Sequence, residues 1–174
     1  MNEATPAPSS SPASGLVYGD VPNRIIAYII DGFVLFAINI VIIAVLAGLL
    51  SGLIGSIVFT VVGLAISGAY FVYTWTRMRA TLGMKVLSLQ IGTAPGGATI
   101  TTDQAIRRWL ALGAAFTIAQ MLASALGAIG FLISFAALGW FIFLLVTTAQ
   151  SPTKQGWHDK FANTQVVKAA KSVG

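Results

Sequence analysis

The chain contains three long apolar stretches in which charged residues are almost absent. Residues 25–50 carry a single charge, that of Asp31, and residues 53–76 and 109–149 carry none. About 20 consecutive apolar residues are enough for a helix to cross the roughly 30 Å hydrocarbon core of a bilayer. The last stretch is about twice that length, and the sequence SALGAIGF in its middle predicts a tight turn. The pattern therefore predicts an all-α membrane protein with four transmembrane helices, at about residues 24–50, 53–76, 104–126 and 129–149.

The positions of the basic residues favour four helices over three. Every Lys and Arg lies at the start of the first helix, between the second helix and the first turns of the third, or after the fourth. In that order they are Arg24; Arg77, Arg79, Lys85, Arg107 and Arg108; and Lys154, Lys160, Lys168 and Lys171. Basic residues concentrate in the cytoplasmic loops of membrane proteins, and four crossings leave all of them on one side. We therefore expect both termini to be cytoplasmic.

The composition agrees with this class of protein. Hydrophobic residues make up 56% of the chain and charged residues 9%, whereas about a quarter of the residues in soluble domains are charged. The formal net charge of +5 reflects this topology, and it predicts attraction to the lipid bilayer and its anionic headgroups. Nucleic-acid binding is not expected, because the basic residues flank helices and form no known recognition fold.

The segments outside the helices predict two tails and a cap. Residues 1–17 are rich in Pro, Ser and Ala, which predicts a disordered tail, and they lack the basic and apolar regions of a signal peptide. A membrane domain over residues 18–168 and a tail of residues 169–174 complete the expected organisation. KVLSLQIG alternates partly between apolar and polar positions and is followed by the turn sequence TAPGGATIT. We expect this hairpin, in residues 85–100, to join the strand TQVVK and a short helix around Trp157–Phe161 in a small β-containing cytoplasmic cap.

Asp31 is the most unusual residue of the first predicted helix. An acidic side chain at the centre of a membrane helix costs about 2.5–3.5 kcal/mol on insertion scales. Arg24 lies seven residues earlier on the same helical face, but side chains lean toward the helix N-terminus, so Arg24 should point out toward water and away from Asp31. Arg107 and Arg108 begin the third helix on the same side of the membrane. We therefore expect Arg107 or Arg108 to pair with Asp31.

Three interpretations of this group of charges remain open. In the first, Arg24, Asp31, Arg107 and Arg108 form a structural ion-pair site that holds helices one and three together. In the second, Asp31 binds and releases a proton or a cation in a vestibule that opens to the cytoplasm. Contact with a protein partner or a lipid headgroup is a third possibility.

Two uncharged polar residues lie deeper in the predicted membrane helices. Asn39 follows Asp31 in helix one, and Gln120 lies at a comparable depth in helix three. A hydrogen bond between them is the simplest expectation, since polar pairs between membrane helices contribute about 0.6 kcal/mol. A polar path from Asp31 through Asn39 and Gln120 is the alternative.

The C-terminal region contains His158, the single histidine, followed by Asp159. The chain has no cysteine, so we expect no metal site and no cofactor. We expect His158 to be a surface residue that orients Asp159 toward a basic cluster made of Arg77, Arg79 and Lys85. The chain also lacks a phosphate-binding loop and a nucleophile elbow. We therefore expect that it is not an enzyme.

Four motifs occur in an order that resembles a known family. RIIAYIIDGF, ATLGMKVLSLQIGT, AIRRWLAL and GWHDKFANTQVV together resemble the RDD family of small bacterial membrane proteins, over about residues 18–168. The family is named for one arginine and two aspartates, which the resemblance maps onto Arg24, Asp31 and Asp159. One departure is that Met84 separates the glycine of TLG from Lys85, where the family often has a basic residue. The resemblance implies a multi-pass protein of the bacterial inner membrane.

The resemblance also implies transport, including ion or proton exchange, as one function suggested for such proteins. We expect a homo-oligomer in that case, because four helices with short loops leave little room for a pathway inside one chain. The alternative hypothesis is a non-catalytic accessory or assembly subunit of a larger membrane protein complex. The small size of the chain and its small residues at four-residue spacing favour this alternative.

Overall fold

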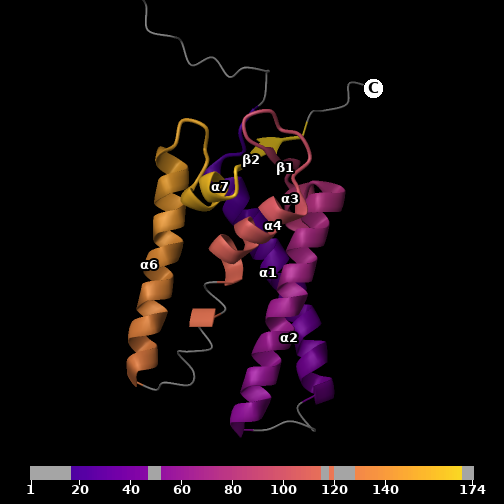
Figure 1. Ribbon diagram of the computed structural model, residues 1–174, viewed down its shortest axis with the longest axis vertical. Helices are drawn as coiled ribbons and strands as arrows, with labels where there is room; N and C mark the ends of the chain where they lie inside the picture. The colour runs from indigo at the N-terminus through magenta and orange to yellow at the C-terminus, as the bar shows by residue number, and fades with distance from the viewer. Residues whose placement is uncertain (1–16, 47–51, 115–117, 120–127, 170–174) are drawn as a thin grey trace, which may run out of the picture.

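The computed structural model describes residues 17–46, 52–114, 118–119 and 128–169. Three long helices dominate it: α1 (Val21–Leu46), α2 (Gly52–Tyr73), which continues as the π-helical turn η1 (Thr74–Met78), and α6 (Ala128–Gln150). Among the described residues, these three are long and apolar enough to cross a membrane. Figure 1 shows α1 and α2 side by side and α6 apart from them, all running away from a cap of short elements.

The helix expected at residues 104–126 is described only in part. It begins as α4 (Thr102–Trp109) and continues as the π-helical turn η2 (Leu110–Ala114). Most of its remaining residues lie outside the part of the chain that the structure describes. Thr101 caps α4 by accepting a hydrogen bond from the Gln104 amide, and the Gln104 side chain accepts one from the Thr101 amide. Helix α6 begins at the end opposite the cap (Figure 1).

The cap is a two-stranded sheet with three short helices around it. Strand β1 (Leu89–Thr93) pairs antiparallel with β2 (Thr164–Lys168), and α3 (Leu82–Val86) and α7 (Trp157–Phe161) lie beside them with α4. The predicted TQVVK strand and the helix at Trp157–Phe161 are therefore confirmed. The expected hairpin is wrong in part, because among the described residues the segment 85–100 supplies one strand and a turn.

Both ends of the described chain meet at this sheet. Tyr18, just before α1, forms a β-bridge with Val167 of β2, and the Lys168 amide donates to the Val17 carbonyl at 2.8 Å. The core lies directly beneath, where apolar side chains of α1, α2, η1, α3 and the strands pack together. Large apolar side chains along the outer faces of α1, α2 and α6 are exposed, as lipid-facing positions require.

Candidate functional site

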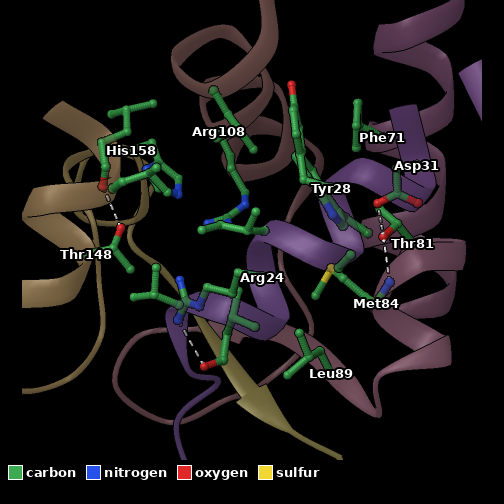
Figure 2. A pocket seen from close by; sticks show the side chains of 18 of the residues that line it. Arg24, Tyr28, Asp31, Phe71, Thr81, Met84, Leu89, Arg108, Thr148 and His158 are labelled. Carbon is green, nitrogen blue, oxygen red and sulfur yellow. Dashed lines mark hydrogen bonds between the residues drawn. The ribbon is translucent and has the colours of Figure 1, made fainter. Parts of the chain in front are cut away.

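A cavity of about 90 Å³ lies where the cap meets the long helices. Side chains from the three long helices, from η1 and η2, and from the short helices and strands of the cap line it, and most of them are apolar. Its lining residues with polar side-chain atoms are Arg24, Tyr28, Asp31, Trp75, Thr81, Arg108, Thr148 and His158. Figure 2 shows Arg24, Arg108 and His158 on one side of this space, with Asp31 and Thr81 on the other, beyond Tyr28 and Met84.

Asp159 is the centre of the charged side of the cavity. It lies in the first turn of α7 and is completely buried. Its Oδ2 accepts from Arg24 Nη1 at 2.7 Å and from the Gly156 amide at 3.1 Å, and its Oδ1 accepts from Arg108 Nη1. One carboxylate therefore binds the partly buried Arg24 of α1 and the buried Arg108 of α4, which ties both helices to α7.

The two arginines also bond to the cap sheet. Arg24 Nε donates to the Gly19 carbonyl at 3.0 Å, and its Nη2 donates to the Val166 carbonyl at 3.3 Å. Arg108 Nη1 donates to Thr164 Oγ1 at 2.8 Å. Arg24 turns away from Asp31, as predicted, but it is buried against Asp159 and does not point into water. The expected contact of Asp159 with Arg77, Arg79 and Lys85 is wrong.

Asp31 has a different set of partners. Its carboxylate accepts hydrogen bonds from the Tyr70 hydroxyl at 2.7 Å, the Thr81 hydroxyl at 2.6 Å and the Gly83 amide at 2.8 Å. Thr81 is also the N-cap of α3, since its Oγ1 accepts from the Met84 amide. Asp31 is 2% exposed, and all three of its donors are neutral.

The predicted pairing of Asp31 with Arg107 or Arg108 is therefore wrong. Arg107 forms an exposed ion pair with Asp103 of its own helix, at 2.9 Å, and Arg108 binds Asp159. The physical reason is the position of α3, which folds back against α1 and presents its N-terminal donors to Asp31. Such an N-terminus suits a carboxylate, because its first amides have no partner within the helix.

His158 is buried, so its predicted surface position is wrong. It is 6% exposed, and its Nε2 lies 3.6 Å from Asp159 Oδ2, which is too far for a hydrogen bond. Burial, together with the positive charges of Arg108 and Arg24, holds the pKa of His158 well below its usual value of 6.5. His158 is therefore neutral in the folded protein near neutral pH.

This lowered pKa predicts that the protein loses stability in mild acid. The unfolded chain binds a proton at His158 as the pH falls through about 6.5, whereas the folded chain does not. The stability loss attributable to His158 should approach about 1.4 kcal/mol per pH unit below 6.5, until the folded pKa is reached. Thermal unfolding in detergent between pH 8 and 5.5 measures this loss. His158→Gln, which has no titrating ring, should flatten the profile; an equally steep profile would contradict the assignment.

The deeper polar residues of the membrane helices form no pair that the structure describes. Asn39 donates from Nδ2 to the Leu35 carbonyl of its own helix at 2.8 Å, and Gln120 lies outside the described residues. Asn39 lines a second cavity, of about 230 Å³, between α1 and α2. Tyr28 and Phe71 line both cavities, so the Asn39 cavity adjoins the one that contains Asp31.

Sequence reasoning missed three residues of the site. Tyr70, near the end of the second predicted helix, binds Asp31 through its hydroxyl, and nothing in the sequence indicates this contact. Thr81 belongs to the TLG motif, and threonine is a favoured N-cap residue, so the start of a helix with unpaired amides could have been predicted at this position. Trp75 lies under Arg108, whose guanidinium carbon is 5.2 Å from the centre of the indole ring. Nothing in the sequence indicates that contact.

The described residues contain no group of three or more His, Asp or Glu side chains arranged to hold a metal ion. The family model of the RDD family matches residues 18–163 of the chain. No curated protein matches the chain, and no solved structure matches it. Arg24, Asp31 and Asp159 all lie within the matched residues and all contribute to the cavity or to its charged side.

Proposed function

The chain belongs to the RDD family, and from this premise we propose that it is a non-catalytic membrane transport protein in which Asp31 exchanges a proton or a monovalent cation. In this proposal the protein resides in the bacterial inner membrane with both termini in the cytoplasm. The meeting of Tyr18 with Val167 at one sheet supports termini on a single side. The cavity then faces the cytoplasmic side of the bilayer.

The burial of Asp31 and its hydrogen-bond partners are the main support for the proposal. It is a buried carboxylate inside a helix that is long and apolar enough to span the membrane, and it has neutral donors only. Ionisable residues at such positions are rare and commonly belong to ion or proton pathways. Asp159, in contrast, forms ion pairs with two arginines, so it is not free to exchange an ion.

The surroundings of Asp31 suit an exchangeable ion. The carboxylate and the hydroxyls of Tyr70 and Thr81 bring several oxygen atoms together, and oxygen is the ligand that hard cations prefer. Tyr28 and Phe71 separate this group from the cavity beside Asn39 and Ser67. The two adjoining cavities support a pathway that continues along the α1–α2 interface.

Asp31→Asn is expected to reduce sodium- or proton-driven flux at least tenfold in liposomes that contain the purified protein. Asparagine is neutral at every pH and carries no exchangeable charge, whereas its shape is nearly that of aspartate. Flux is measured with an internal pH dye and normalised to the amount of folded, reconstituted protein. Asp103→Asn is the matched control, because Asp103 is exposed in a surface ion pair; its flux should equal that of the unchanged protein.

Two results would contradict this proposal in different ways. Equal flux from the unchanged protein and Asp31→Asn would show that Asp31 takes no part in transport. No flux from the unchanged protein with any monovalent cation or proton gradient would exclude transport of these ions. That second result would favour the accessory-subunit hypothesis, which a reproducible hetero-complex in mild detergent would then support.

A further inference from the structure

Three buried nitrogen atoms in the first cavity lack hydrogen-bond partners among the described residues. They are Trp75 Nε1, Arg108 Nε and His158 Nδ1. The three side chains are 2%, 4% and 6% exposed, and all of them line the cavity. Buried polar atoms in native proteins are nearly always hydrogen-bonded. Three unpaired nitrogens around one space therefore point to a ligand that bonds to them.

The charge around these nitrogens is positive. Arg24 and Arg108 share the single carboxylate of Asp159, which leaves one positive charge in excess on this side of the cavity. His158 adds none, because it is neutral. Asp31 lies on the other side (Figure 2), where it is bound by three donors of its own. An uncompensated buried charge is costly, so an anion is the ligand that this side of the cavity favours.

The shape and chemistry of the donors narrow the class of anion. A guanidinium group forms strong, directional hydrogen bonds with oxyanions, and an indole N–H is a donor only. The oxygens of a phosphate group accept from both, and from His158 Nδ1 when that nitrogen carries the ring proton; free hydrogen phosphate can also donate to Nδ1 in the other tautomer, which a phosphodiester headgroup cannot. We propose that this cavity binds a phosphate group through Arg108, Trp75 and His158, supplied either as free phosphate or by a phospholipid headgroup.

The test uses the purified full chain in detergent at pH 7.5. The thermal unfolding midpoint is followed as sodium phosphate is added, against sodium chloride at matched ionic strength. A parallel titration adds short-chain phosphatidylglycerol against phosphatidylcholine of the same chain length. We expect a saturable rise of the midpoint beyond the matched control, since a ligand that binds only the folded state stabilises it. A rise of the midpoint with sodium phosphate would identify the ligand as the free anion. A rise with phosphatidylglycerol alone would identify it as the phospholipid headgroup.

Trp75→Phe tests the site itself. It keeps an aromatic ring beneath Arg108 and removes the Nε1 donor, which should raise the dissociation constant about tenfold, as expected for one hydrogen bond to a charged group. Trp157→Phe is the matched control, because Trp157 lies on α7 and is not part of the cavity lining; its dissociation constant should not change.

Two outcomes overturn the phosphate site. In the first, neither phosphate nor phosphatidylglycerol raises the midpoint beyond its matched control. In the second, Trp75→Phe binds as tightly as the unchanged protein. The inference goes beyond the proposed ion exchange and does not depend on it, because the binding test involves neither flux nor Asp31.

Discussion

Replacing Asp159 with asparagine is expected to destabilise the protein by about 3–5 kcal/mol, the range measured when one partner of a buried ion pair is removed. Asp159 is completely buried and accepts from both Arg24 and Arg108. Asparagine would leave the positive charges of the partly buried Arg24 and the buried Arg108 close together with no carboxylate between them. It would also weaken the bond from the Gly156 amide that helps to start α7. Chemical or thermal unfolding in detergent measures the loss.

Two further variants make this prediction specific. Asp103→Asn removes the carboxylate of an exposed ion pair, and such pairs contribute about 0–1 kcal/mol, so its stability should change little. Arg108→Met combined with Asp159→Asn removes one charge of each sign and should be more stable than Asp159→Asn alone. If Asp159→Asn is as stable as Asp103→Asn, then Asp159 does not bind the two arginines as described.

The long helices were predictable because a bilayer imposes a simple rule on sequence. A helix that faces lipid on most sides must be apolar around its circumference, and α1, α2 and α6 begin and end within a few residues of the predicted ranges. The short helix of the tail and its strand were also predictable from local pattern. Local rules work for these elements because each depends on its own residues and on the medium around it.

The partners of the charged residues were not predictable in the same way. Asp31 and Arg108 were expected to meet because both lie near one side of the membrane, yet each has a nearer partner from the cap. Thr81 and Gly83 reach Asp31 from a distant part of the chain, and Asp159 reaches Arg108 from another. Depth in a bilayer restricts one coordinate of a residue, whereas an ion pair depends on all three. The resemblance to the RDD family singled out Arg24 and Asp159 together, but not the bond between them.

The close approach of α1 and α3 makes Gly83→Ala the second strongly destabilising change. A Cβ atom on Gly83 would lie 2.0 Å from the carbonyl oxygen of Ala27 and 2.8 Å from its carbonyl carbon. These are backbone atoms of α1, so the two helices would have to separate. Overpacking of this kind costs about 1–3 kcal/mol, and separation would also weaken the bond from the Gly83 amide to Asp31, a hydrogen bond to a charged group worth about 1.5–3 kcal/mol.

We therefore expect Gly83→Ala to lower the free energy of unfolding by on the order of 4 kcal/mol, the sum of these two effects. Gly96→Ala is the matched control in the same cap, because a Cβ atom there meets nothing within 4 Å; its unfolding should be nearly unchanged. Thermal unfolding of both variants in detergent measures the difference. If Gly83→Ala unfolds at the same temperature as Gly96→Ala, then α3 does not lie against α1 at this distance. Asp31 would in that case lack the amide donor that α3 supplies.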